Sequence, residues 1–107
     1  MTKCEFFRDG ARITGFSVSG HSGYSEAGSD IVCAAISAVV GMAEATINDV
    51  CGGKAKVRVK EADARITLTL PAVCEEEESV QAVLAGMMLY LLNLRDAYSD
   101  FIEVLEV

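Results

Sequence analysis

The chain has 107 residues, of which 51% are hydrophobic, enough to bury the core of one domain spanning residues 1–107. Its formal net charge of -7 argues against direct contact with nucleic acid, because phosphate contacts require clustered lysine and arginine. The N-terminal residues are too polar for a signal peptide, and the uninterrupted apolar run Val83–Leu92 falls short of the roughly 20 residues that a membrane helix needs. We therefore expect a cytoplasmic protein with no membrane partner.

Two strands joined by a tight turn are predicted first. The predicted strands are Lys3–Arg8 and Ala11–Ser19, in which aromatic and β-branched residues lie among polar ones. The Asp-Gly pair between them is a strong hairpin signal. In the second strand, alternation puts Phe16 and Val18 on one face and Ile13 on the other. The sequence thus predicts an antiparallel hairpin at the start of the chain.

A glycine-rich loop is expected at residues 20–28. Its glycines, Gly20, Gly23 and Gly28, supply conformational freedom that a purely structural connection does not need. The loop also carries the only histidine of the chain, His21. A histidine beside a glycine is often an ordinary loop residue, so its interpretation depends on the helix that comes after the loop.

A helix is predicted over Asp30–Cys51, with Ser29 as its N-cap and Cys33 in its first turn. A thiol there lies near backbone N–H groups that have no partner within the helix and near the positive end of the helix dipole, and both favour the thiolate. With His21 it forms a candidate Cys–His pair for nucleophilic catalysis. The ordinary alternative remains open, because a cysteine in an apolar helix is usually a small core residue.

The same helix is apolar on almost every side in its first half, which predicts that it is covered by a sheet and by a second surface. Gly52-Gly53 is expected to end it. The chain has four cysteines and no CxxC or His/Cys metal spacing. We therefore expect thiols rather than disulfides, no metal and no cofactor.

The second half of the chain predicts two strands, a helix and a last strand. These elements are Lys54–Lys60, Ala64–Leu70, Glu75–Tyr98 and Phe101–Val107. Ala55, Val57 and Val59 are expected to face inward, while the alternating lysines and arginine form a basic row that is most simply a solvated sheet face. The acidic run Glu75–Glu78 suits the first turn of a helix, although a patch that binds a basic peptide is the alternative.

The resulting order β-β-α-β-β-α-β predicts an α+β fold, a mixed sheet with two helices packed on one face. The predicted helix Glu75–Tyr98 carries an apolar stripe at helical spacing, which contains Val80, Val83, Leu84, Met87, Leu91, Leu94 and Tyr98. Apolar residues around Leu89 and Tyr90 widen it beyond what one sheet would cover. Large exposed apolar patches mark interfaces, so the sequence predicts a homodimer.

Two motifs resemble those of the Prp family of ribosomal-processing cysteine proteases. They comprise Gly20-His21-Ser22-Gly23-Tyr24, then Gly28, Asp30-Ile31-Val32-Cys33-Ala34-Ala35 and Ser37. In that family a GHxGY loop supplies a histidine, and a G-x-DIVCAA-x-S helix start supplies the nucleophile. Ser22 stands where the family commonly has alanine, and Ile36 where it commonly has valine. Neither change touches the proposed chemistry.

The resemblance implies that Cys33 is the nucleophile and His21 the general base, with the other loop residues contacting substrate. Backbone N–H groups at the helix start are the expected oxyanion donors. Asp30 and Ser37 are candidate supporting residues. Asp30 can equally be a first-turn helix stabiliser, and the Ser37 hydroxyl can equally bond the Cys33 carbonyl one turn earlier.

The resemblance also implies a substrate and an assembly. Family members remove a short N-terminal extension, after its aromatic and apolar end, from the twenty-seventh protein of the large ribosomal subunit, and they are dimers. A competing reading is a non-catalytic ribosome-associated binding module in which Cys33 is a core residue. A third is a thiol redox sensor, which needs Cys4 or Cys74 close to Cys33.

Overall fold

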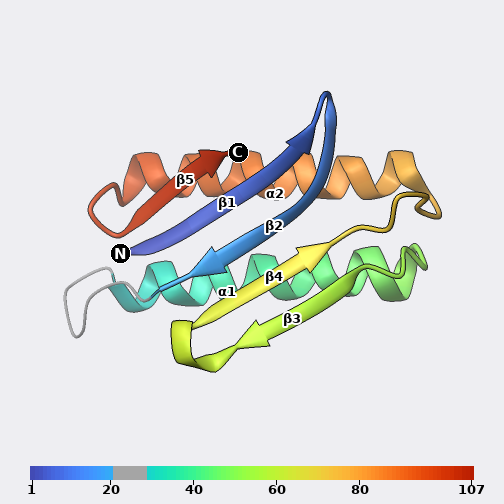
Figure 1. Cartoon of the computed structure of the whole chain (residues 1–107). Coiled ribbons are helices and arrows are strands. Elements are labelled where there is room, and N and C mark those ends of the chain that lie inside the picture. Colours follow the sequence, from blue (N-terminus) through green and yellow to red (C-terminus); the bar gives the residue numbers. More distant parts are fainter. Residues whose placement is uncertain (21–28) are drawn as a thin grey trace.

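A computed structural model describes residues 1–20 and 29–107, the side chains of the second range from residue 31 onward. One five-stranded sheet has two long helices on a single face (Figure 1). The elements are β1 (Thr2–Asp9), β2 (Arg12–Ser19), α1 (Ser29–Ala45), η1 (Thr46–Val50), β3 (Lys56–Lys60), η2 (Glu61–Asp63), β4 (Arg65–Thr69), α2 (Glu77–Ala97) and β5 (Ile102–Glu106). The predicted α+β fold and element order are confirmed, with ends shifted by one or two residues.

The strand order across the sheet is β3-β4-β2-β1-β5. Neighbours are antiparallel except for β1 and β5, which run parallel with Thr2 opposite Ile102. The sheet is therefore mixed, as predicted, and its first and last strands lie side by side.

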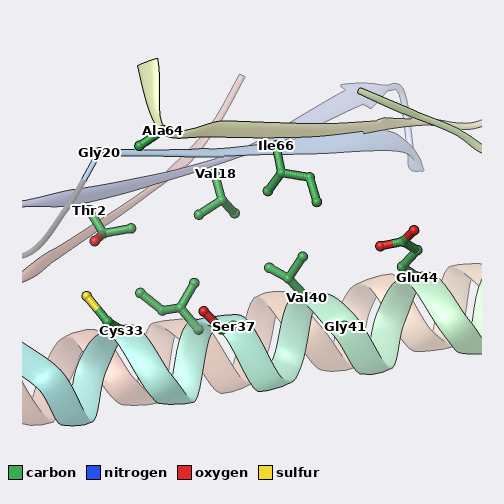
Figure 2. Close-up of a pocket in the computed structure, with 11 residues that line it drawn as sticks. Thr2, Val18, Gly20, Cys33, Ser37, Val40, Gly41, Glu44, Ala64 and Ile66 are labelled. Carbon is green, nitrogen blue, oxygen red and sulfur yellow. The ribbon is translucent and has the colours of Figure 1, made fainter. Parts of the chain in front are cut away.

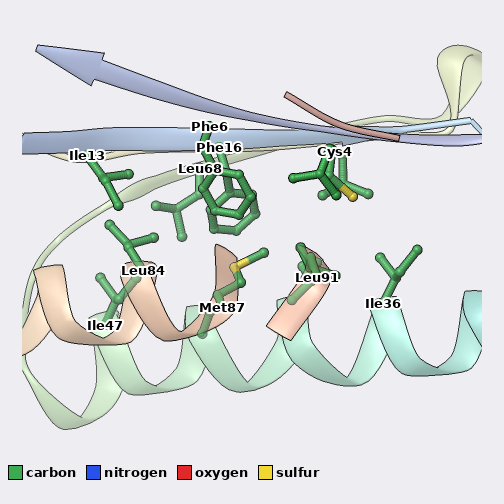
Figure 3. Packing of buried hydrophobic residues seen from close by; sticks show 14 of the residues in the cluster. Cys4, Phe6, Ile13, Phe16, Ile36, Ile47, Leu68, Leu84, Met87 and Leu91 are labelled. Atoms are coloured by element: carbon green, nitrogen blue, oxygen red, sulfur yellow. The ribbon is translucent and has the colours of Figure 1, made fainter. Parts of the chain in front are cut away.

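A β-bulge in β2 changes which residues reach the core. Phe7 pairs with Gly15 and Arg8 pairs with Ile13, so Thr14 is an extra residue. One extra residue reverses the inward–outward alternation of a strand. Ile13 therefore faces the helices and is 3% exposed (Figure 3), and the prediction that it lies on the opposite face is wrong.

Two contacts hold this irregular part of β2. The side-chain amide of Gln81 on α2 accepts a hydrogen bond from the Ile13 N–H at 2.8 Å and donates one to the Ile13 carbonyl at 2.7 Å. A Cβ placed on Gly15 would lie 2.1 Å from the carbonyl oxygen of Leu68 on β4. Only glycine allows β4 to approach so closely there.

The first helix changes its winding before it ends. α1 passes into the π-helical η1, and Gly52 then adopts a left-handed conformation with φ +66°. The Gly53 N–H donates to the Ile47 carbonyl at 2.7 Å. This wide closing bond fits the π winding, and it confirms Gly52-Gly53 as the helix end.

The second helix forms the centre of the core. Its buried side chains are Val80, Leu84, Met87, Leu91 and Leu94. They pack against fully buried residues of the sheet, including Phe6 and Phe16 (Figure 3). The predicted stripe is confirmed.

The acidic run before this helix is divided between loop and helix. Glu77 and Glu78 lie in the first turn of α2, whereas Glu76 has a left-handed backbone. The Arg12 guanidinium binds the Glu77 carboxylate and donates to the Pro71 carbonyl at 2.7 Å, and the bond to Glu77 raises the pKa of Arg12. The run therefore serves helix α2 only through its second half.

The edge strand β3 is more exposed to solvent than predicted. Lys56, Arg58 and Lys60 are exposed on β3, as predicted. Val57 is half-buried, but Val59 is 67% exposed. The expectation that Val59 is buried is wrong, because the layer of helices does not cover this end of the edge strand.

The first helix is also less covered than predicted. Ile31 is 57% exposed and Met42 is 53% exposed on α1. The segment Ile31–Val50 is 28% buried, and it is long and apolar enough to cross a membrane by length and composition alone. The core helix of a soluble protein passes the same test, so this property does not make α1 a membrane span. The sequence prediction did not include the segment because it rests on uninterrupted apolar runs.

Candidate active site

A pocket of about 430 Å³ lies between α1 and the sheet (Figure 2). Its lining comprises Thr2, Val18, Gly20, Ala64 and Ile66 on the sheet side, and Cys33, Ile36, Ser37, Val40, Gly41 and Glu44 on the helix side. We call this pocket the α1 groove. Cys33 lies at one end of it and Glu44 at the other.

Cys33 is the fifth residue of α1 and is half-buried. Its sulfur lies on the sheet side of the helix, facing Thr2 (Figure 2). The N–H groups of the first four helical residues have no carbonyl partner within a helix. The thiol thus stands directly after a set of backbone donors, one residue further into the helix than predicted.

Gly20 lies at the same end of the α1 groove, and the site requires a glycine there. Its φ is +84°, and a Cβ would lie 2.8 Å from the Met1 carbonyl oxygen. This close approach brings the end of β2 against the start of β1, where Thr2 lines the groove. Gly20 is the residue directly before His21.

The remaining predicted site residues lie outside the described part of the chain. They are His21, Ser22, Gly23, Tyr24 and Gly28, together with the Asp30 side chain. Their roles stay predictions. Within the described residues the structure brings together Gly20, Cys33 and Ser37, which all line the α1 groove.

Ser37 lies one helical turn after Cys33 and its hydroxyl is on the groove side (Figure 2). The predicted alternative, a bond from this hydroxyl to the Cys33 carbonyl, is not among the hydrogen bonds between described residues. Thr46 does make such a bond, to the Met42 carbonyl at 2.7 Å. The Ser37 hydroxyl is therefore available to a ligand in the groove.

Two polar residues of the lining were missed by the sequence analysis, as were its apolar residues. Thr2 is 4% exposed, its N–H donates to the Phe101 carbonyl at 2.9 Å, and its hydroxyl oxygen faces Cys33 (Figure 2). No pattern in the sequence indicates it. Glu44 had a signal, because it is the only charged residue between Asp30 and Asp49.

The other three thiols do not line the α1 groove. Cys4 is fully buried, and burial raises its pKa to about 12. Burial and, next, the Glu77 carboxylate raise the pKa of Cys74, whose sulfur lies 3.6 Å from the Gly53 carbonyl beyond the other end of α1. The redox-sensor alternative needs a second thiol close to Cys33, and none of the other three cysteines lines the groove.

The part of the chain that the structure describes contains no candidate metal site. No three His, Cys, Asp or Glu side chains gather there closely enough to hold a metal ion. Among the described residues, the polar side chains that line the groove are the Cys33 thiol, the Ser37 and Thr2 hydroxyls and the Glu44 carboxylate.

A thiol at the end of an apolar groove indicates a candidate cysteine hydrolase. A comparison of the sequence with protein families identifies the kind of hydrolase. Residues 1–103 match the family model described as cysteine protease Prp. The chain belongs to this family and is a cysteine protease. The search of curated protein sequences gives no significant match.

Solved structures share the fold over the whole chain. SMU.848 from Streptococcus mutans has a TM-score of 0.89 at 23% identity, covering 100% of this chain and 94% of its own. The ribosomal processing protease Prp from S. aureus, in complex with a substrate peptide, has a TM-score of 0.87 at 19% identity over 100% of both chains. The same enzyme with a covalently linked product peptide has a TM-score of 0.85 at 21% identity, again over 100% of both chains.

Proposed function

We propose that this protein is a cytoplasmic cysteine endopeptidase that removes the N-terminal extension of the twenty-seventh protein of the large ribosomal subunit. One observation carries the choice of residues: Cys33 is the only cysteine that lines the α1 groove, and Gly20, which lines the same end, directly precedes His21. The motif around both residues and the family support the proposal. A substrate peptide bound to the S. aureus enzyme is consistent with a peptide substrate here.

The proposed reaction has two steps. His21 takes the proton of Cys33, whose sulfur attacks the scissile carbonyl, and the amine leaves with that proton while a thioester joins the N-terminal part of the substrate to Cys33. Water, activated by His21, then hydrolyses the thioester. Backbone N–H groups at the start of α1 stabilise the oxyanion in both steps, and Asp30 and Ser37 support the pair.

The groove fits the apolar end of such an extension. Its floor between Cys33 and Glu44 is built from Val18, Ile36, Val40 and Ile66. An extended peptide laid along these residues would bury aromatic or aliphatic side chains, at about 25 cal/mol per Å² of apolar surface. The groove thus favours a peptide that is apolar beside the scissile bond.

The decisive test is incubation of the extended ribosomal protein with the wild-type enzyme and with Cys33→Ala, followed by mass spectrometry. We expect one cut at the end of the extension in the wild type and a rate at least about 1000-fold lower in the variant. The variant should lose only about 1 kcal/mol of stability, since one small sulfur is removed. Cys51→Ala is the matched control and should cleave normally. Equal cleavage by folded Cys33→Ala would refute the proposed mechanism.

We further propose that the protein is a homodimer joined through its layer of helices. α1 exposes an apolar stripe that includes Ile31, Ala34, Ala38 and Met42, and Leu89 is 60% exposed on α2. The α1 residues repeat at helical spacing, so their stripe is continuous, and Tyr90 is exposed beside Leu89 on α2. A second copy is the partner that would cover a surface this apolar on both helices.

Sedimentation velocity tests the dimer. We expect a dimer at micromolar concentration and a monomer for Met42→Glu, since the new charge would be buried without a partner. Val73→Glu is the control, because Val73 is 90% exposed and lies outside both helices. A wild-type monomer, or an unaltered Met42→Glu dimer, would contradict this interface.

A further inference from the structure

We infer that Glu44 forms a subsite for a lysine or arginine side chain of the substrate, about five residues from the scissile bond. The inference rests on the proposed function, since it assumes that an extended peptide occupies the α1 groove with its scissile bond at Cys33. It adds a charge requirement to a groove that otherwise selects apolar side chains.

Glu44 differs in charge from the residues around it in the groove. It is the only charged residue among the described residues that line the groove, and Val40 and Ile66 line the groove beside it. Its carboxylate extends toward the sheet side of the groove (Figure 2). A carboxylate that lines an apolar groove favours a cationic partner, because a hydrogen bond between two charged groups is stronger than one between neutral groups.

No such partner is present in the described part of the chain. Glu5, Glu77 and Glu106 form ion pairs with arginines. Glu44 forms no ion pair or hydrogen bond with any described side chain. The carboxylate is thus available to a ligand, and the charge it would complement is positive.

The length of the groove sets the position of the basic residue. Glu44 follows Cys33 by eleven residues on one continuous helix. At a rise of about 1.5 Å per residue, the two side chains are separated by about 17 Å along the helix axis. An extended peptide advances about 3.3 Å per residue, so about five substrate residues span the distance.

The groove also has room for a long basic side chain at this end. A Cβ built on Gly41, three residues before Glu44, meets nothing within 4 Å. The aliphatic stem of lysine or arginine can lie over Gly41 and Val40 while its charged end reaches Glu44.

Fluorogenic peptides that span the cleavage site of the extended ribosomal protein test this subsite. Lysine is placed singly at three to seven residues from the scissile bond, on each side, and compared with norleucine, which keeps the stem without the charge. We expect one position, about five residues away on one side, where lysine lowers KM about fivefold with kcat unchanged. Glu44→Gln should abolish that preference, and the exposed Glu78→Gln, with the same net charge, should retain it.

Binding to folded Cys33→Ala protein separates this inference from the proposed chemistry. Fluorescence anisotropy should show the same fivefold preference for the lysine peptide, lost on adding Glu44→Gln. Glu44→Lys should reverse it in favour of a glutamate peptide. No cleavage by the wild-type enzyme would refute the proposed function. Cleavage or binding without a lysine preference, or a preference that Glu44→Gln leaves intact, would overturn the Glu44 subsite.

Discussion

The two long helices lie on the same face of one sheet but are used differently. α2 buries a continuous stripe against the strands and fixes the β2 bulge through Gln81. α1 shares the α1 groove with the sheet and leaves Val59 on the edge strand uncovered. Both helices bury side chains in the core, but the α1 side also keeps apolar surface open to a ligand. A small protease can in this way hold a binding site without a separate domain.

A pair of glycine substitutions, one inside the sheet and one on α1 beside the groove, should give the largest difference. Gly15→Ala places a methyl group 2.1 Å from the Leu68 carbonyl oxygen, so we expect a loss of about 3–4 kcal/mol in the free energy of unfolding. Gly41→Ala meets no atom and removes a helix-destabilising residue, so we expect a gain of about 0.5–1 kcal/mol. Urea denaturation measures both. Effects of the same sign would contradict either the close approach of β4 at Gly15 or the open space at Gly41.

A pH series probes the packed side through Cys4. Burial raises the pKa of Cys4 from 9.0 to about 12, so between these values the folded thiol stays protonated while the unfolded thiol ionises. The folded state then binds the extra proton, and stability falls as pH rises, by about 1.4 kcal/mol per pH unit.

Cys4→Ala should remove this slope. Between pH 9 and 10.5 we expect wild-type protein to lose about 2 kcal/mol more than the variant, measured by urea denaturation at each pH. Comparing slopes cancels the packing cost of the substitution. Parallel pH profiles would mean that water reaches the Cys4 thiol.

Two valines give the smallest and most direct comparison. Val80 on α2 is 0% exposed, and Val40 on α1 is 7% exposed and lines the groove. We expect Val80→Ala to cost about 2–3 kcal/mol because it leaves a closed cavity, and Val40→Ala about 1 kcal/mol because it enlarges an open one. Val40→Ala should also raise KM for the peptide. A larger stability cost at Val40 would contradict the division between the helices.

Much of the fold was predictable because local patterns and tertiary contacts agree. The alternation in the strands and the stripe on α2 both match buried faces. The exceptions arise where a non-local contact decides: Ile13 turns inward because Thr14 is an extra residue in the pairing with β1. Val59 alternates like a buried residue, but its exposure depends on how far the layer of helices extends across the sheet, which no local pattern encodes.

The site shows the same division. The loop and helix motifs identify Cys33 and Gly20 from adjacent residues alone. Thr2 enters the groove only because β1 lies beside the end of β2, through an approach that Gly20 permits. Glu44 belongs to the site only because α1 runs straight from Cys33, so its role needed the length and direction of the helix.

The parallel pairing of β1 with β5 has a consequence for how the enzyme matures. The pairing joins residues about 100 positions apart, from Thr2 with Ile102 to Phe6 with Glu106. During synthesis, β1 emerges first and must wait for the last strand, and such long-range contacts form slowly. Thr2 forms part of both this pairing and the α1 groove. The groove is therefore completed only after residues near 102 leave the ribosome, so a nascent chain cannot cleave before β5 has emerged.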